Sequence, residues 1–269
     1  MVGANAASFM LDTNGDVWAW GDEASGRLGN GVVGPSFPRS YVTPTEVLIP
    51  NPVQSISGGQ EFSFALDTEG HVWSWGSNTY KSLGRTIEPE TATGTPGKIS
   101  VTDDVQFASV SVSYNGTAVA AVDTSGRIWT WGDGPIGRSG DPAIPARIVS
   151  TTEIAAANGG IDIDTVPFEK VAVGSSAMVA LDRFGRLWSW ARSETTADEA
   201  GRTSSYATIP VMLTAATTGV PGFDEQRFVD VVYGGSYAFA LHENGNLWTW
   251  DTTYVGTTYV SPSDIGFPN

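Results

Sequence analysis

The residue types that most often carry out catalysis are scarce in this chain. Its 269 residues include two histidines, His71 and His242, and no cysteine, which excludes thiolate chemistry and thiolate metal sites. Each histidine adjoins a turn, where an exposed polar side chain is expected, and the sequence identifies no partner carboxylate for general acid or base catalysis. The segment Gly174-Ser175-Ser176 lacks the Gly-x-Ser-x-Gly pattern of a nucleophile elbow. We therefore expect a protein that is not an enzyme and has no catalytic residues.

Aspartate recurs at one position of a repeating pattern, as Asp12, Asp67, Asp123 and Asp182. Such a series could supply metal ligands, but an aspartate that opens a turn also accepts hydrogen bonds from the turn backbone. Residues 12–16 read Asp-Thr-Asn-Gly-Asp and half match a calcium loop, although the bidentate glutamate at the twelfth position of such a loop is missing. We expect turn-forming aspartates, no bound metal and no cofactor.

All ten tryptophans fall into five Trp-x-Trp tripeptides. These are Trp18/Trp20, Trp73/Trp75, Trp129/Trp131, Trp188/Trp190 and Trp248/Trp250. Successive pairs begin 55, 56, 59 and 60 residues apart, which indicates a tandem repeat.

Each tripeptide belongs to a predicted β-hairpin. Apolar stretches at residues 8–11, 62–66, 118–122, 177–181 and 238–241 each lead into a short polar turn. The turn ends with Gly15, Gly70, Gly126, Gly185 or Gly245, where positive φ is expected because glycine adopts it without steric cost. The two tryptophans of a pair share one face of the outgoing strand, since side chains alternate along a strand. We expect them to be buried between strands and sheets.

Two further strands complete each repeat. One contains a Pro-x-x-aliphatic element and is expected at a sheet edge, because proline cannot donate to the ladder. These elements are Pro44-x-x-Val47, Pro96-x-x-Ile99, Pro145-x-x-Ile148, Pro210-x-x-Leu213 and Pro262-x-x-Ile265. The other strand is predicted at residues 53–56, 107–112, 168–173 and 228–232. Four short strands in about 50 residues are typical of a propeller blade.

These patterns resemble the repeat family named after the regulator of chromosome condensation. Its repeats combine a strand ending in Ala-Leu, a glycine turn, an aromatic-x-Trp-Gly strand, a Gly-x-Leu-Gly segment and Pro-x-x-Val. Matching residues are Ala65-Leu66, Ala180-Leu181, Ala240-Leu241, Gly26-Arg27-Leu28-Gly29, Leu83-Gly84 and Gly137-Arg138-Ser139-Gly140. The resemblance implies an all-β fold, a five-bladed β-propeller of four-stranded blades that forms a single domain over residues 1–269.

We also predict how the ring closes. Repeat 1 begins too late to contain its own Pro-x-x-aliphatic strand, whereas the chain ends with an extra one at residues 262–265. Pairing of the C-terminal and N-terminal segments would complete the first blade and leave no long open edge. The alternative is an open arc that a partner chain completes.

The formal charge of −15 comes from 14 Lys and Arg against 29 Asp and Glu. Such a field opposes phosphate contacts, so we expect no direct nucleic-acid partner. No apolar run could span a bilayer, and the start of the chain does not resemble a secretory signal. We expect no membrane insertion and a cytoplasmic or virion-associated protein.

Sequence differences between repeats concentrate in the connections. The first connection carries Val33, Phe37, Arg39 and Tyr41, a mixture of side chains that suits a protein interface. The alternative is a loop that folds back over its own blade. Arg27, Arg85, Arg138 and Arg202 each follow a glycine in such a connection and could bind an anionic ligand or form ion pairs with the abundant carboxylates.

Three functions agree with these observations. The first is a non-enzymatic, protein-interaction propeller that is a structural or attachment component of a larger assembly, such as a phage virion or surface appendage. The second is a soluble regulator or inhibitor that binds a GTPase or an enzyme. The third is a carbohydrate-binding propeller. We favour the first, because the chain lacks an assembled catalytic set and fold does not determine function.

Overall fold

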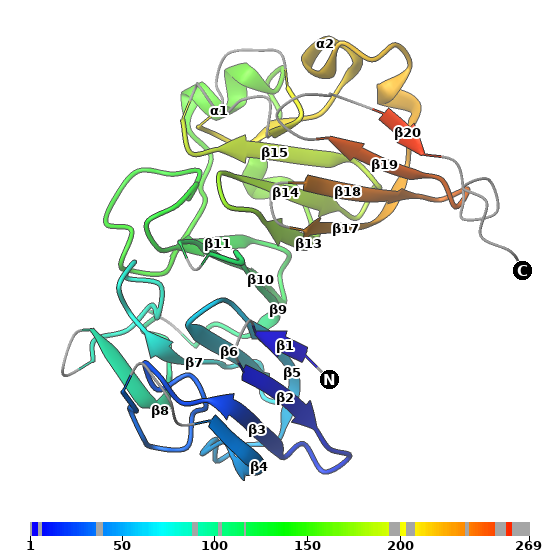
Figure 1. Cartoon of the computed structure of the whole chain (residues 1–269). Coiled ribbons are helices and arrows are strands. Elements are labelled where there is room, and N and C mark those ends of the chain that lie inside the picture. The colour runs from blue at the N-terminus through cyan, green and yellow to red at the C-terminus, as the bar shows by residue number, and fades with distance from the viewer. Residues whose placement is uncertain are drawn as a thin grey trace, which may run out of the picture. The chain divides into compact units, whose positions relative to one another are not determined.

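The computed structural model describes residues 2–4, 7–35, 40–87, 91–101, 104–115, 117–193, 200–202, 208–234, 237–250 and 257–259. Within these residues the chain forms five four-stranded sheets, one for each Trp-x-Trp pair (Figure 1). The all-β class and the four strands per repeat are confirmed. None of the described helices is long and apolar enough to cross a membrane.

Each sheet takes its strands from consecutive segments of the chain, and neighbours in sequence pair with one another. The first sheet contains β1 Val2–Ala4, β2 Ala7–Leu11, β3 Val17–Asp22 and β4 Ser40–Glu46. The second contains β5 Val53–Gly58, β6 Phe62–Asp67, β7 Val72–Ser77 and β8 Ala92–Lys98. The third contains β9 Phe107–Val112, β10 Val119–Asp123, β11 Ile128–Trp131 and β12 Ala146–Arg147.

The fourth sheet contains β13 Phe168–Val173, β14 Ala177–Asp182, β15 Leu187–Ala191 and β16 Val211–Met212. The fifth contains β17 Phe228–Gly234, β18 Tyr237–His242, β19 Leu247–Trp250 and β20 Thr257–Tyr259. Two connections also hold short helices, which the sequence patterns did not predict: α1 Thr152–Ala157 with the 3₁₀ turn Ile163–Thr165, and α2 Ala215–Thr218 with the 3₁₀ turn Phe223–Glu225.

The predicted Trp hairpins are confirmed. In the second sheet, for example, β6 and β7 pair antiparallel with Ala65 opposite Trp73 and Ser63 opposite Trp75. The turn glycine that precedes each Trp strand has positive φ in all five copies. Seven of the ten tryptophans are buried, whereas Trp18, Trp20 and Trp129 are partly exposed.

Strands β4 and β8 contain Pro44 and Pro96, β12 and β16 begin directly after Pro145 and Pro210, and all four lie at sheet edges, as predicted. Their place in the repeat differs from the prediction, because each one follows the Trp strand and pairs with it. The first sheet therefore has its own edge strand, β4 with Pro44, and needs no strand from the C-terminus to reach four. In the fifth sheet the edge strand is β20, upstream of Pro262, and residues 260–269 lie outside the described residues.

The chain divides into two compact units, and the boundary passes through the third sheet. The first unit comprises Met1–Thr124, Trp129–Asp133 and Asp141–Ala146, and the second comprises Ser125–Ile128, Gly134–Gly140 and Arg147–Asn269. In the first unit Phe9 packs edge-on against Trp75, and Phe64 packs in the same way against Trp131. In the second unit Val179 and Leu181 belong to one core cluster with Trp248 and Trp250. In both units, therefore, a Trp face is covered by the second strand of the preceding repeat.

Candidate functional site

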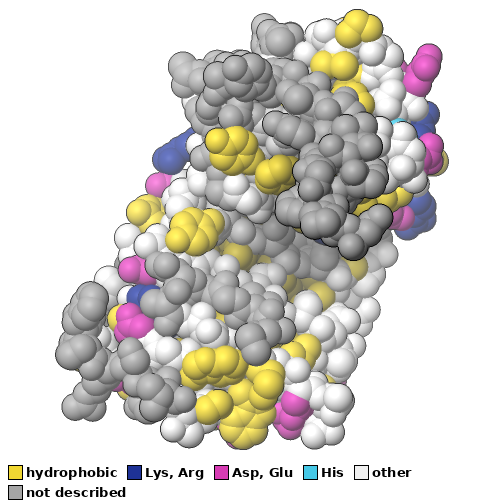
Figure 2. Space-filling view, turned by 45° about the vertical axis from the view of Figure 1, so that its right-hand side comes forward, with side chains coloured by type: hydrophobic (Ala, Val, Ile, Leu, Met, Phe, Trp, Pro, Cys, Tyr) yellow, Lys and Arg dark blue, Asp and Glu magenta, His cyan; other side chains and the backbone are white. Residues whose placement is uncertain are grey.

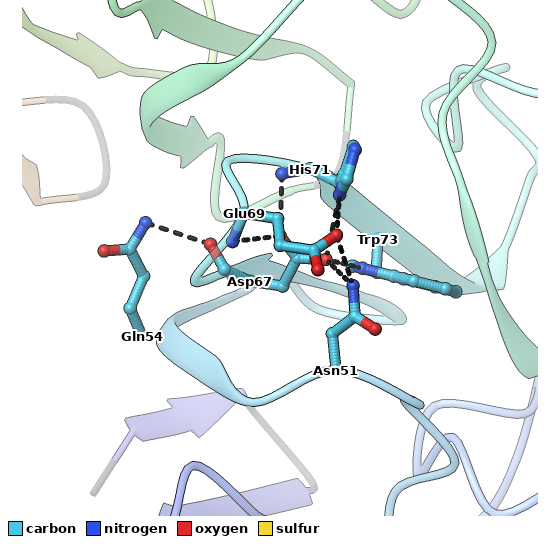
Figure 3. Close-up of polar contacts among 6 residues, drawn as sticks. All are labelled: Asn51, Gln54, Asp67, Glu69, His71 and Trp73. Atoms are coloured by element: carbon cyan, nitrogen blue, oxygen red, sulfur yellow. Dashed lines mark hydrogen bonds and ion pairs between the residues drawn. The ribbon is translucent and has the colours of Figure 1, made fainter.

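A polar cluster surrounds Asp67 at the end of β6 (Figure 3). Its Oδ1 atom accepts hydrogen bonds from the backbone amides of Glu69 (3.0 Å) and His71 (2.8 Å), so the carboxylate closes the hairpin turn. Its Oδ2 atom accepts from the indole nitrogen of Trp73 at 2.9 Å. One side chain thus holds both the turn and the first tryptophan of the pair.

Two further donors reach the same carboxylate oxygen. Asn51 Nδ2 lies 2.9 Å from Asp67 Oδ2, and His71 Nδ1 lies 3.2 Å from it. Burial on its own would raise the pKa of Asp67, but the hydrogen bonds from Trp73, His71 and Asn51 outweigh burial and hold this pKa below its usual value. Asp67 is therefore a buried carboxylate that its neighbours keep ionised.

Asp67, Glu69 and His71 also have the geometry of a metal site, since their ligand atoms lie within 4.8 Å of one another. The donors around Asp67 argue for a structural role, because a cation at Oδ2 would have to displace hydrogen bonds from Trp73 and Asn51. The carboxylate partners of His71 were not predicted from the sequence. Their signal was the spacing of Asp67 and Glu69, four and two residues before the histidine.

His71 lines a small pocket of about 230 Å³ together with Lys98 and Asp104. An imidazole next to a buried carboxylate can act as a base. Among the described residues that line this pocket there is no hydroxyl or thiol side chain for it to activate. The arrangement supports a turn that is held by hydrogen bonds rather than a nucleophilic site.

The whole clamp recurs at Asp182 and parts of it recur at Asp123 and Asp12, and the turn-forming role predicted for these aspartates is confirmed for Asp12, Asp67 and Asp182. Asp182 accepts hydrogen bonds from the amides of Phe184 and Arg186 and from the Trp188 indole at 3.0 Å. Asp123 accepts from the Trp129 indole at 2.8 Å, and Asp12 accepts from the amides of Asn14 and Asp16. In the fifth repeat His242 takes this position, and its Nδ1 accepts from the amide of Asn244.

The second tryptophan of a pair makes a different contact, with the preceding repeat. The indole nitrogens of Trp75, Trp131 and Trp190 donate to the carbonyl oxygens of Arg27, Ser82 and Pro135, at 2.9, 2.6 and 2.6 Å. A glycine two residues after each acceptor lies against the indole. For Gly29, Gly84 and Gly137 an added Cβ would come within 2.8 Å of the ring. These glycines are needed for close contact as well as for their positive φ.

The first connection is the predicted protein-binding loop, and its first part is held against the second sheet. The amide of Gly31 donates to the carbonyl of Gly94 in β8 at 2.9 Å, and Gly34 donates to Glu23. Val32 and Val33 are nevertheless 42% and 53% exposed. On the face shown in Figure 2, exposed hydrophobic side chains gather in several separate groups.

Of the other predicted binding residues, Phe37 and Arg39 lie outside the described residues. Tyr41 lies in β4, opposite Gly21 of β3, and only its backbone is described. The structure therefore places Val33 on an exposed loop and leaves the grouping of the four residues untested.

The four arginines that follow a glycine in a connection do not share one position in the repeat. Arg27 lies two residues before the glycine that contacts the indole, whereas Arg85, Arg138 and Arg202 directly follow that glycine. Arg27 is buried and forms ion pairs with Asp22 (3.8 Å) and Glu61 (4.0 Å), as the ion-pair alternative predicted. Arg85 differs, because it lines a pocket of about 680 Å³ with Lys81.

Comparison with known proteins identifies the repeats. A model of the regulator of chromosome condensation (RCC1) repeat matches residues 14–66 and 69–120, and a second model with the same description matches residues 53–81. The human E3 ubiquitin-protein ligase HERC2 is 25% identical over 245 residues, which cover 89% of this chain and 5% of HERC2. The human Regulator of chromosome condensation is 26% identical over 220 residues, which cover 76% of this chain and 48% of that protein.

Among solved structures, Prp20p from Saccharomyces cerevisiae superposes with a TM-score of 0.67 at 18% identity, covering 90% of this chain and 55% of Prp20p. The chain thus spans about half the length of Prp20p and of the human regulator, and a far smaller part of HERC2. The sheets have the fold of this propeller. Residues 14–120 carry RCC1 repeats, and the family resemblance inferred from the tryptophan, glycine and proline pattern is confirmed.

Proposed function

We propose that this chain is a non-enzymatic β-propeller that binds another protein through the connections between its strands. The observation that carries the proposal is the first connection. Its backbone is held by hydrogen bonds to Gly94 and Glu23, while Val32 and Val33 remain exposed. A loop with a fixed backbone and exposed apolar side chains loses little conformational entropy when a partner covers it.

The relatives support a binding or regulatory role. Human Regulator of chromosome condensation is named for regulation, and the structure of Prp20p was described with its binding to Gsp1p and histones. Those partners belong to those proteins. What we carry over is the use of an RCC1-type propeller surface to bind protein.

The experiment compares affinity for captured partners. The immobilised chain is used to isolate binding proteins from its source, and each is then titrated against a Val32→Ser/Val33→Ser variant. We expect the variant to keep its melting temperature, because surface-loop changes usually cost within about 0.5 kcal/mol each. We expect its affinity to fall by about 2 kcal/mol or more, as for hot-spot residues.

The matched control is Phe184→Ser, which removes an exposed aromatic side chain in the β14–β15 turn. It should leave affinity unchanged. Equal affinity of the double variant and the wild type would exclude the first connection as the binding surface. Turnover of any substrate by the purified chain would contradict a non-enzymatic role.

A finer proposal is that the chain is a structural or attachment component of a larger assembly, such as a phage virion or surface appendage. It is supported by the cysteine-free β composition alone. Sedimentation of the chain with assembled particles tests it. Capture of a soluble GTPase or enzyme instead would favour the regulator or inhibitor role, which agrees with the names of the relatives.

We also propose that residues 1–269 form a single domain, a five-bladed ring closed by pairing of the C-terminal and N-terminal segments. The support comes from the fifth sheet, where Leu241 is 37% exposed although the corresponding Leu181 of the fourth sheet is 2% exposed. Deletion of residues 260–269 should lower the melting temperature by many degrees, because it would expose ladder edges and apolar surface. An unchanged melting temperature would count against closure.

A further inference from the structure

The guanidinium of Arg85 is held by three hydrogen bonds. Its Nε donates to Ser74 Oγ at 3.1 Å, and its Nη2 donates to the carbonyl oxygens of Ser74 and Thr95, both at 2.9 Å. Gly97 makes room for the group, since an added Cβ there would lie 2.7 Å from Arg85 Cζ. These contacts hold the side chain and use two of its three nitrogens, which leaves Nη1 for a further acceptor.

The guanidinium lacks an ion-pair partner within the described part of the chain. Arg27, Arg147, Arg183 and Arg186 each lie within 4.0 Å of a carboxylate oxygen, and no described carboxylate comes that close to Arg85. Burial lowers the pKa of Arg85, so the protein removes water from this charge without supplying a described counter-ion. A partly buried, unpaired charge is costly, and such groups in a cleft mark candidate binding sites.

The pocket beside Arg85 has the size of a ligand site. Its volume of about 680 Å³ falls in the range of roughly 300 to 1,000 Å³ that such sites occupy. Lys81 provides a second cation, and Ile87 and Ile144 provide apolar wall. The backbone of Lys81 has φ of 56°, a conformation that non-glycine residues seldom adopt and that often accompanies function.

The charge of the pocket contrasts with that of the chain. Among its described lining residues two are cationic and one, Asp141, is acidic, whereas acidic residues outnumber basic ones by 29 to 14 in the whole sequence. One oxygen of Asp141 already accepts the amide hydrogen of Ala143. Glu88 and Glu90 follow Ile87 in sequence and lie outside the described residues, so the experiment below includes them.

We propose that this pocket receives an acidic side chain of the protein partner. Arg85 Nη1 and Lys81 Nζ bind its carboxylate, and the apolar neighbours of that residue pack against Ile87 and Ile144. The inference rests on the proposed protein-binding function and names the chemistry of the partner. A protein segment is favoured over a small anion because the volume and the isoleucines extend well beyond one carboxylate.

The test uses a short fluorescent peptide that alternates glutamate with leucine, with a glutamine-for-glutamate peptide as its control. Anisotropy titrations are run at low and at physiological ionic strength. We expect binding of the glutamate peptide that weakens with salt, and a loss of about tenfold or more in Arg85→Gln. Lys81→Asn should also weaken binding, and asparagine tolerates the positive φ at that position.

Arg183→Gln is the matched control, because it removes one exposed cation elsewhere and should leave peptide affinity unchanged. If Arg85→Gln does not fold, the peptide affinity of Lys81→Asn decides whether the proposal stands. Equal affinity for the glutamine peptide, or wild-type affinity in both pocket variants, overturns the proposal. So does binding that appears only after Glu88→Gln/Glu90→Gln, because the chain's own carboxylates would then occupy the cations.

Inorganic phosphate is titrated as a separate arm. Phosphate binding as tight as that of the peptide and equally dependent on Arg85 would overturn a partner side chain in favour of a simple anion site. A captured partner that binds Arg85→Gln as well as the wild type would remove this inference and leave the proposed function intact. Failure to capture any protein, with peptide binding as expected, would instead count against the proposed function.

Discussion

Replacing Trp75 with phenylalanine tests the contact that joins the first and second repeats. The indole nitrogen of Trp75 donates to the carbonyl of Arg27, 48 residues earlier, and the ring is fully buried. Phenylalanine leaves that carbonyl without its donor, which costs about 1 to 3 kcal/mol, and leaves part of the indole volume empty at a further cost of about 1 to 2 kcal/mol. The expected loss is therefore about 2 to 5 kcal/mol, a large part of a typical stability of about 5 to 15 kcal/mol. Trp75→Ala, which also loses the edge-on contact with Phe9, should cost at least about 3 to 5 kcal/mol.

Trp20→Phe is the matched control for this change. Trp20 occupies the same position in the first repeat, but it is partly exposed and its indole has no hydrogen bond to any described residue. We expect a loss below about 1 kcal/mol, as for most substitutions away from buried polar groups. Urea unfolding followed by circular dichroism measures both free energies.

Amide hydrogen exchange locates the effect. Protection of Gly26, Arg27 and Gly29, whose amides donate within the first connection, should fall in Trp75→Phe and persist in Trp20→Phe. If both variants lose the same free energy, or if exchange in this connection does not change, the indole contact does not join the repeats and the reasoning is refuted.

Two other predictions concern the turn clamp and the close-contact glycines. Asp67→Asn should lower stability by about 1 to 3 kcal/mol at neutral pH, because it removes an acceptor with several donors. Because the pKa of Asp67 is lowered in the folded protein, its carboxylate stabilises the fold fully above the ordinary pKa of 3.8, and this stabilisation is lost as the pH falls through the lowered pKa. The melting temperatures of the wild type and Asp67→Asn should therefore converge in acid. A difference in melting temperature that stays constant with pH would contradict this prediction. Gly84→Ala should lower the free energy of unfolding, measured by chemical denaturation, more than Gly160→Ala does. Both glycines have positive φ, but only at Gly84 would an added Cβ lie 2.8 Å from the Trp131 indole. Equal losses of free energy would show that this contact can relax.

The parts of the fold that repeat could be predicted from sequence. The hairpins, the positive φ of Gly15 and Gly70, and the edge position of the proline strands follow from local rules that apply to every copy. The role of Asp67 in the turn was predicted for the same reason. Its bond to Trp73 was missed, although aspartate stands six residues before the first tryptophan in four copies.

Features set by the tertiary fold could not be predicted in this way. The proline strand pairs with the Trp strand that precedes it, and this pairing cannot be read from sequence spacing. Because the proline strand was assigned to the wrong repeat, the first sheet was predicted to lack one strand. Helices α1 and α2 occur in connections that differ between repeats, so periodicity carries no information about them. The fixed guanidinium of Arg85 depends on Ser74 and Thr95 of two different strands, which sequence spacing alone does not bring together.

The two tryptophans of a pair have separate tasks, and this division explains how the connections can vary while the scaffold stays the same. In the second, third and fourth repeats the first tryptophan bonds to the aspartate of its own turn, and the second bonds to a carbonyl two residues before a glycine of the preceding connection. That glycine lies nine residues after Trp20, nine after Trp75, six after Trp131 and eleven after Trp190, yet it contacts the next repeat's indole each time. Residues between the tryptophan and the glycine can therefore change in number and type without moving the contact between repeats. The surfaces proposed to bind a partner, around Val33 and Arg85, lie next to these anchored glycines, where sequence can diverge at little cost to the fold.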